Sequence, residues 1–178
     1  MVSWTAVVLA GGRGSRLGGV DKAAVVVDGR TLLDHVLDAV AGARATVVVG
    51  PRKDDVPGVT WAREEPPGGG PLAGLAAGLA HVRTDLVVVL AVDQPGLTRS
   101  TVDRLLAAVA DSGAVLVDEG GRLQWLAGAW RVAALRRALP ADPRDVSMRS
   151  VLGPLDPVTV LARPGEARDV DTPRDLTR

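Results

Sequence analysis

A glycine-rich stretch with three basic residues is the first part of the sequence whose residue types point to chemistry. It reads VVLAGGRGSRLGGVDK over residues 7–22, with five glycines between positions 11 and 19 and the cations Arg13, Arg16 and Lys22. Glycines admit positive φ and close backbone approach, so successive N–H groups can converge on an anion. Arginine and lysine add charge-assisted hydrogen bonds to the same ligand. The stretch therefore predicts a loop that wraps a polyanion such as a triphosphate, in preference to a flexible connection with solvated charges.

The spacing within this loop excludes three familiar motifs. A dinucleotide fingerprint fails because Leu17 stands where the third glycine of Gly-x-Gly-x-x-Gly is required. A Walker A loop fails because Lys22 follows an aspartate and precedes an alanine, where Gly-Lys-Ser/Thr is needed. A nucleophile elbow around Ser15 fails because Arg13 occupies the position of its first glycine. The anion-binding prediction thus depends on glycine and charge, without support from these motifs.

Acidic residues follow two other segments and suggest a metal site. Asp93 ends the apolar run TDLVVVLAVD at residues 84–93, and Pro95 interrupts regular structure directly after it. In doubly wound sheets, ligands bind beyond the carboxyl ends of the strands, so we expect Asp93 beside the glycine-rich loop, where it can hold Mg²⁺ against phosphate oxygens. Asp169 and Asp171 alternate in RDVDTPRDL and therefore share one face of an extended chain, as a second contact for the same ion. The competing interpretation is that these carboxylates cap turns or short helices.

Strands and helices alternate along the chain. Apolar runs rich in valine predict buried strands, and leucines and valines at helical spacing predict amphipathic helices between them. The expected strands are 5–10, 45–50, 58–63, 84–93, 113–118, 123–131 and 158–161, and the expected helices are 31–40, 72–82, 102–109 and 132–139. Residues 64–71, EEPPGGGP, predict a loop. This order predicts an α/β fold with three layers and a mainly parallel sheet, formed by residues 1–178 as a single domain.

Composition argues against several classes of function. The formal net charge of the 178 residues is zero, which gives no support to a nucleic-acid or membrane partner. There is no cysteine, which excludes thiolate nucleophiles and disulfides. Four tryptophans are the only aromatic residues, so we do not expect a bound base to stack on an aromatic ring. The segment MVSWTAVVLAGG lacks the features of a signal peptide, and no apolar run approaches the roughly 20 residues of a membrane span, so we expect a cytoplasmic protein.

Four motifs together resemble one enzyme family. LAGGRGSRLGGVDK at 9–22, GPLAG at 70–74, VDQP at 92–95 and DVDTP at 169–173 follow the order found in the molybdenum cofactor guanylyltransferases. These belong to the wider nucleotidyltransferases, and the resemblance implies their Rossmann-like fold of the nucleotide-diphospho-sugar transferase type. It also implies transfer of GMP from GTP to the phosphate of molybdopterin, the organic part of the molybdenum cofactor, with Mg²⁺ and release of pyrophosphate. Molybdoenzyme maturation proteins are the partners that such an enzyme implies.

The same resemblance implies roles for individual residues. The implied nucleotide-binding residues are Leu9, Ala10, Gly11, Gly12, Gly14, Lys22, Gly70, Pro71, Leu72, Gly74 and Asp93. Arg16 and Lys22 hold phosphates and form the catalytic set with Asp93, while Asp93 and Asp171 hold the metal. Gly12 and GPLAG favour guanine, because the similar cytidylyltransferases tend to carry alanine at the first position and to lack the second.

This chemistry requires no catalytic base, because the attacking phosphate oxygen is already anionic and catalysis reduces to positioning and charge neutralisation. Two other interpretations stay open: cytidylyl or guanylyl transfer to another phosphorylated small molecule, and a non-catalytic GTP-binding protein of the same fold. The set of Lys22, Asp93 and Asp171 argues against the non-catalytic protein, which has no need of it. The roles of Asp169, Arg149 and Arg13 stay open as well.

Overall fold

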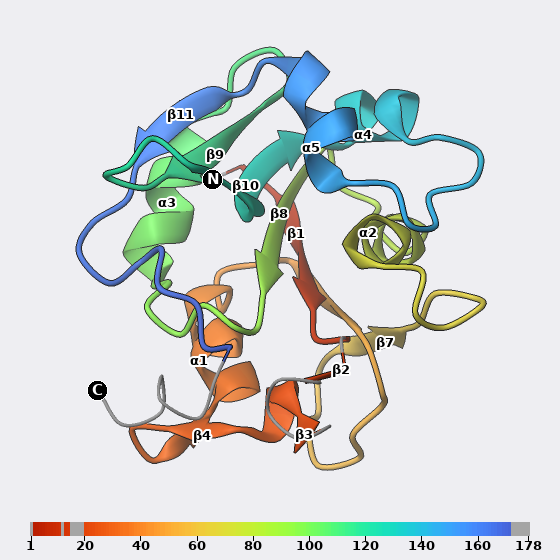
Figure 1. The fold of residues 1–178 in the computed structure, drawn as a ribbon, viewed down its shortest axis with the longest axis vertical. Helices are drawn as coiled ribbons and strands as arrows, with labels where there is room; N and C mark the ends of the chain where they lie inside the picture. The colour runs from red at the N-terminus through yellow and green to blue at the C-terminus, as the bar shows by residue number, and fades with distance from the viewer. Residues whose placement is uncertain (1, 12, 15–19, 172–178) are drawn as a thin grey trace.

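A seven-stranded sheet forms the centre of the computed structural model, which describes residues 2–11, 13–14 and 20–171 (Figure 1). In spatial order its strands are β11 (Val158–Leu161), β9 (Gly113–Val117), β10 (Leu123–Arg131), β8 (Leu86–Ala91), β1 (Trp4–Leu9), β6 (Ala45–Val49) and β7 (Thr60–Ala62). All neighbouring strands are parallel except β10, which runs antiparallel to both β8 and β9. The predicted α/β class with a mainly parallel sheet is confirmed.

Helices cover both faces of this sheet and complete the three predicted layers. They are α1 (Leu32–Ala39), α2 (Pro71–Leu79), α3 (Arg99–Ala108), α4 (Val132–Ala138) and α5 (Met148–Leu152). In Figure 1, α1 and α3 lie on one side of the sheet, and α2, α4 and α5 lie on the other. None of the helices in the described ranges is long and apolar enough to cross a membrane.

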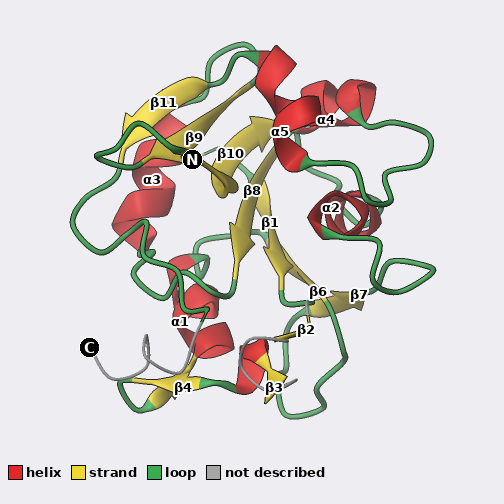
Figure 2. Ribbon diagram, in the orientation of Figure 1, coloured by secondary structure: helices red, strands yellow, loops and turns green. Residues whose placement is uncertain are grey.

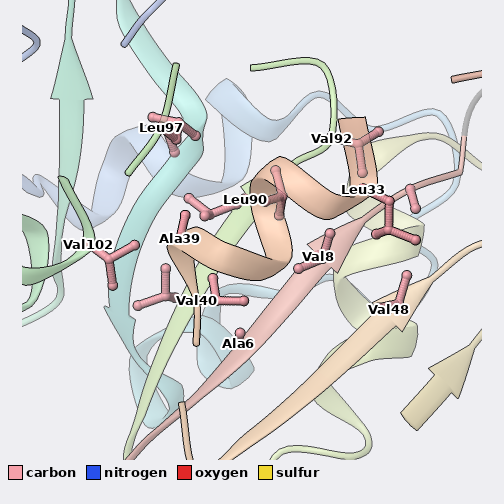
Figure 3. Packing of buried hydrophobic residues seen from close by; sticks show 14 of the residues in the cluster. Ala6, Val8, Leu33, Ala39, Val40, Val48, Leu90, Val92, Leu97 and Val102 are labelled. Atoms are coloured by element: carbon pink, nitrogen blue, oxygen red, sulfur yellow. The ribbon is translucent and has the colours of Figure 1, made fainter. Parts of the chain in front are cut away.

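The core consists of two aliphatic clusters, one on each face of the sheet. Successive residues of a strand point to opposite faces, so Ala6 and Val8 of β1 join the cluster under α1 and α3. Val7 and Leu9 of the same strand join the cluster under α2, α4 and α5. Figure 3 shows part of the first cluster, in which Val8 lies near Leu33 of α1 and Ala6 lies nearer to Val40. Because both faces are covered, the strands read as continuous apolar runs.

Local sequence signals explain where the helices begin. Thr31 accepts a hydrogen bond from the Asp34 amide at 3.0 Å, and the Asp34 carboxylate accepts one from the Thr31 amide at 3.1 Å. This capping box starts α1 at Leu32, as its sequence spacing predicts. Thr98 and Thr101 form a second capping box at the start of α3. The side-chain caps satisfy backbone N–H groups that a helix leaves without partners in its first turn.

Two short hairpins precede α1. The first pairs β2 (Arg13–Gly14) with β3 (Val20–Asp21), and the second pairs β4 (Val26–Val27) with β5 (Arg30–Thr31). The turn of the second hairpin contains Asp28 and Gly29, both with positive φ, as the Asp-Gly signal in the sequence predicts. A 3₁₀ helix, η2 (Lys22–Ala24), connects the two hairpins, and a second one, η3 (Gly153–Leu155), follows α5. The first hairpin and η2 carry Lys22 to the sheet edge described below.

Glycines let α2 lie close to the sheet. A Cβ atom at Gly78 would meet Val7 Cγ1 at 2.6 Å and Val49 Cγ2 at 3.1 Å, both in the core. A Cβ atom at Gly74 would meet Leu9 and Val49 at 3.5 and 3.6 Å, which is ordinary contact. Of the two glycines, only Gly78 is required for this close packing. In the structure, α2 therefore packs so closely on β1 and β6 that a side chain at Gly78 would overlap Val7.

We expect Gly78→Ala to destabilise the protein and Gly74→Ala to leave its stability unchanged or raised. Overpacking against fixed core side chains costs about 1–3 kcal/mol, which exceeds the gain of about 1 kcal/mol from replacing a helical glycine. At Gly74 a Cβ atom would fit without overpacking, so only the stabilisation from replacing a helical glycine applies. Urea unfolding of both variants measures the difference. Equal free energies of unfolding for the two would show that α2 does not sit this close to β1.

Candidate active site

The carboxyl ends of three parallel strands meet at one edge of the sheet and open into a cavity of about 880 Å³. Leu9 at the end of β1 is level with Val49 of β6 on one side and Ala91 of β8 on the other. The backbone continues this pairing beyond the strands, because the amide of Val92 donates to Leu9 O at 3.2 Å. Figure 2 shows β1 and β8 pointing to the same edge, near which β2 and β3 lie. The loops that follow these strands therefore start side by side, as predicted for a doubly wound sheet.

The amino end of α2 forms part of the cavity wall. Gly70, Pro71 and Gly74 line the cavity. Gly70 has a φ of +86°, which favours glycine at this turn. Pro71 is the first helical residue, where a missing N–H costs nothing. The amino end of a helix carries positive partial charge, so this wall favours a negatively charged or carbonyl group of a ligand.

Three charged side chains from distant parts of the chain meet at the cavity. The Nζ atom of Lys22 lies 3.3 Å from Asp93 Oδ2 and 2.5 Å from Asp171 Oδ1. Lys22 and Asp93 also line the cavity. The three residues belong to separate sequence motifs that predict one site, and the structure brings them together. Two carboxylates therefore converge on one positive charge at the carboxyl edge of the sheet.

The surroundings of Lys22 keep its ammonium charged. Burial alone would lower the pKa of Lys22, but the hydrogen bond to Asp171 and the negative charge of Asp93 outweigh it. As a result the pKa of Lys22 lies above its ordinary value of 10.5. A permanently charged ammonium is what charge neutralisation on a phosphate requires.

The 3₁₀ helix η2 holds Lys22 in place. The Asp21 carboxylate accepts a hydrogen bond from the Ala23 amide at 3.0 Å and so caps the helix. Ala23 is buried in the core next to α1, which anchors the turn. Lys53 forms an ion pair with Asp21 from the loop after β6. These contacts fix the backbone on both sides of Lys22.

Asp171 reaches the site on a segment without helix or strand, residues 163–171, which we call the C-terminal strap. The amide of Val170 donates to Asp93 O at 2.7 Å, and the Val170 side chain is buried. Asp169 accepts a hydrogen bond from Gln94 Nε2 at 3.0 Å. Burial raises the pKa of Asp169 against the opposing effect of Gln94, and the negative charges of Asp93 and Asp171 raise it further. Asp169 and Asp171 thus have different partners: Asp171 pairs with Lys22, and Asp169 accepts from Gln94.

The other end of the strap is held by a buried carboxylate. Glu166 accepts hydrogen bonds from Thr101 Oγ1 at 2.6 Å, from Arg104, and from the Arg163 amide at 2.7 Å. We call this set of contacts the Glu166 clasp. Burial alone would raise the pKa of Glu166, but the hydrogen bonds from Arg104 and Thr101 outweigh it, so the pKa lies below the ordinary 4.5. The clasp therefore holds an ionised carboxylate at near neutral pH.

Most of the residues predicted to bind a nucleotide line the cavity. They are Leu9, Ala10, Gly11, Lys22, Gly70, Pro71, Gly74 and Asp93. Leu72 instead is fully buried in the aliphatic cluster under α2. Gly14 belongs to β2. Gly12 and Arg16 lie outside the described residues. The nucleotide-binding roles of all these residues stay predictions.

Several residues at the cavity are not identified by sequence analysis. They are Asp21, Val49, Gly50, Pro51, Arg63, Glu64, Pro67, Gly68, Ala91, Val92 and Leu126. Several of these residues lie in the run EEPPGGGP, whose last two residues are the first two of GPLAG. Its acidic and glycine-rich composition could have indicated a binding loop, but by itself it predicts only a loop. Glu64 from this run accepts a hydrogen bond from the Gly68 amide at 3.1 Å. Leu126 gives no signal, because its place at the cavity depends on the antiparallel position of β10 beside β8.

Comparison with known proteins identifies the family. The model of the MobA-like NTP transferase domain matches residues 6–158. The chain belongs to this family. Molybdenum cofactor guanylyltransferases from Acidiphilium cryptum, Pseudomonas putida and Vibrio cholerae are 37%, 39% and 35% identical to this MobA-like chain, over 72%, 64% and 68% of its length. The matches span 67%, 63% and 61% of the relatives' own lengths, which is about two thirds or less.

Solved structures show the same nucleotidyltransferase fold. The molybdopterin-guanine dinucleotide biosynthesis protein A of Archaeoglobus fulgidus superposes with a TM-score of 0.69 at 22% identity, covering 97% of this chain and 94% of that one. A nucleotidyl transferase from Methanothermobacter thermautotroptrophicus gives a TM-score of 0.76 at 25% identity, with coverage of 97% and 94%. A 2-C-methyl-D-erythritol 4-phosphate cytidylyltransferase from Thermus thermophilus gives 0.69 at 23% identity, with coverage of 99% and 96%. The MobA-like domain therefore shares its architecture with a molybdopterin-guanine dinucleotide biosynthesis protein and with a cytidylyltransferase.

We expect Glu166→Gln to destabilise the MobA-like domain in a pH-dependent way. At pH 7 the loss should be about 2–4 kcal/mol, since the new amide group faces hydrogen-bond donors in a buried site. Because the folded pKa of Glu166 lies below the unfolded one, its stabilising effect is complete above about pH 4.5 and is lost as the pH falls through the folded value. Urea unfolding of both proteins between pH 7 and pH 3 tests this. A constant difference down to pH 3 would contradict a role for the ionised form.

Proposed function

We propose that this MobA-like protein transfers GMP from GTP to the phosphate of molybdopterin in the molybdenum cofactor and releases pyrophosphate. The observation that carries the proposal is the convergence of Lys22, Asp93 and Asp171 at a cavity lined by glycine-rich backbone. The family supports it, since relatives at 35–39% identity are molybdenum cofactor guanylyltransferases. On the same basis we infer that residues 1–178 act as one domain in the cytoplasm and pass the product to molybdoenzyme maturation proteins.

The reaction is a phosphoryl-type substitution at the α-phosphorus of GTP. An oxygen of the acceptor phosphate forms a new bond to that phosphorus, while the bond to the bridging oxygen breaks and pyrophosphate leaves. The attacking oxygen is anionic, so no proton has to be removed. The chain contributes position and charge: Lys22 neutralises negative charge on the phosphates, and the amino end of α2 adds positive partial charge on the opposite wall.

Asp93 and Asp171 fit a divalent metal ion. Their oxygens already converge on the single positive charge of Lys22, which shows that the two carboxylates can share one cation. Within the described residues no cluster of three or more metal-binding side chains exists. Mg²⁺ bound to a nucleotide usually takes one or two carboxylates and completes its octahedron with phosphate oxygens and water. Bound there, Mg²⁺ would supply further positive charge to the phosphates.

Selection of guanine would rest on polar contacts to the edge of the base. No aromatic side chain lines the cavity in the part of the chain that the structure describes. Guanine presents N1–H and N2–H₂ donors beside the O6 acceptor, a pattern that carbonyl, carboxylate and amide groups can match. The loop before α2 offers such groups in the Glu64 carboxylate and the backbone of Gly68 and Gly70.

We expect GTP to be favoured over ATP by at least about 100-fold in catalytic efficiency, because a site that pairs polar edges leaves buried groups unsatisfied with the wrong base. Pyrophosphate release with each of the four triphosphates, molybdopterin and Mg²⁺ measures this. A preference for CTP would place the chain among cytidylyltransferases. Binding of GTP without pyrophosphate release, with molybdopterin and with other phosphorylated acceptors, would identify a non-catalytic protein.

We expect Lys22→Ala to lower turnover by roughly 100-fold or more, since a cation beside the transferred phosphate contributes a few kcal/mol to the transition state. Asp93→Asn should abolish Mg²⁺-dependent activity while the protein stays folded. The matched controls are Arg52→Ala and Asp54→Asn, which break an exposed ion pair and should retain full turnover. Turnover of Lys22→Ala within a factor of two of wild type would remove Lys22 from the catalytic set, and the same result for Asp93→Asn would make that residue a structural cap.

A further inference from the structure

The position of Asp171 depends on a segment that has no regular secondary structure of its own. The C-terminal strap, residues 163–171, contains no helix or strand, and the Asp171 side chain is 41% exposed. Fixing an irregular backbone costs conformational entropy at every residue, and other contacts must offset that cost. A carboxylate that is to hold a metal must nevertheless stay within a fraction of an ångström of its place. The strap therefore needs anchors outside the site.

We propose that Glu166 is a positioning residue for the metal end of the active site, acting through the strap on Asp171. The proposal rests on the proposed function, because it concerns the site at which Mg²⁺ and the triphosphate would bind. Glu166 lies five positions before Asp171 and does not line the cavity. It would act by holding the start of the strap, so that the carboxylate at the other end stays beside Asp93 and Lys22.

The clasp ties the strap to two elements of the fold. Arg104 on α3 donates from Nη2 to the Glu166 carboxylate and from Nη1 to Leu161 O at 2.9 Å. One guanidinium thus joins α3, the end of β11 and the strap. Thr101, one turn earlier on α3, donates its hydroxyl to Glu166 and is itself fully buried. Because both donors project from one helix packed against the sheet, they give the strap a fixed reference point.

The strap also lies directly against the loop that carries Asp93. A Cβ atom at Gly96 would come within 2.1 Å of Gly165 O, so the two backbones are as close as they can be. Beyond this contact the Val170 amide donates to Asp93 O, and Gln94 donates to Asp169. The strap and the loop after β8 therefore pack along their length, between the clasp at one end and Asp171 at the other.

A purely structural clasp and a positioning clasp predict different results for Glu166→Gln. Loss of stability alone would leave every folded molecule with an intact site. Loss of position would loosen Asp171 in molecules that are still folded, and it would weaken the metal-dependent part of nucleotide binding. Partners that orient a metal ligand typically change metal affinity by about 10–100-fold when they are replaced.

The experiment compares GTP binding by calorimetry with Mg²⁺ and with EDTA, at a temperature where circular dichroism shows each protein fully folded. We call the ratio of GTP affinity with Mg²⁺ to GTP affinity in EDTA the Mg²⁺ gain. For Glu166→Gln we expect the affinity in EDTA to stay within about 2-fold of wild type and the Mg²⁺ gain to fall about 10-fold. Thr101→Val removes one clasp hydrogen bond and should give a smaller decrease in the same direction. Leu135→Ala, in the buried cluster under α4, serves as a destabilised control whose Mg²⁺ gain should equal that of wild type.

A double variant tests whether Glu166 acts through Asp171. In the Asp171→Asn background, Glu166→Gln should cause no further loss of the Mg²⁺ gain, since the group that it positions is already neutral. Additive losses would show that Glu166 acts by another route. Hydrogen exchange adds a readout that needs no ligand: the Val170 amide, bonded to Asp93 O, should exchange faster in Glu166→Gln than in Leu135→Ala.

The outcomes separate the two proposals. Wild-type protein without any Mg²⁺-dependent GTP binding would overturn the proposed function and this inference with it. If wild type shows the Mg²⁺ gain and both clasp variants keep it in full, the inference alone is wrong. An unchanged exchange rate at the Val170 amide in Glu166→Gln would also overturn it, whatever the fate of the proposed function.

Discussion

The parallel pairing of β1 with β8 is the constraint on which the rest of the structure depends. Its register places Leu9 level with Ala91, so the glycine-rich loop and Asp93 leave the sheet at the same point. A shift by one residue would turn every side chain of β1 to the opposite face and disrupt both aliphatic clusters. The packing of the core therefore also sets the geometry of the site. No residue of the site has to pull these two loops together.

The site combines glycine-rich backbone with a cluster of charged side chains. On one side, the ends of β1 and β6 and the start of α2 present glycine-rich backbone that a ligand can approach closely. On the other side, Lys22, Asp93 and Asp171 supply one positive and two negative charges. The ammonium offsets one of the two carboxylates, so the cluster keeps one net negative charge.

Most strands and helices, and the charged residues of the site, could be predicted from the sequence, because short sequence patterns indicate them. Valine-rich runs indicate the strands of the sheet, and the Thr31 capping box indicates the start of α1. Lys22 and Asp93 are predicted to be neighbours because each follows a strand and parallel strands share one carboxyl edge. Asp171 is predicted at the same site from its alternation with Asp169 in RDVDTPRDL and from the family motif. The place of β10 between β9 and β8 could not be predicted in this way, because its pairing with β8 joins segments that are far apart in the sequence.

The Glu166 clasp could not be predicted either, because its partners lie far apart in the sequence. Glu166 stands in a polar stretch, PGEARD, in which nothing distinguishes a buried carboxylate from a solvated one. Its burial comes from Thr101 and Arg104, more than 60 positions earlier in the sequence. Leu72 shows the opposite case. It belongs to a motif associated with nucleotide binding, but its helical phase turns the side chain into the core.

The ion pair between Lys22 and Asp171 spans 149 positions of the chain. At about 5–20 residues per second, a ribosome delivers the carboxylate about 7–30 seconds after the lysine. The strands that flank the cavity are synthesised before the strap, so Lys22 meets Asp171 only after they are complete. Contacts between such distant residues also form slowly in folding, because a long loop must close first. The order of motifs along the gene product thus makes the charged centre the final part of the domain to be assembled.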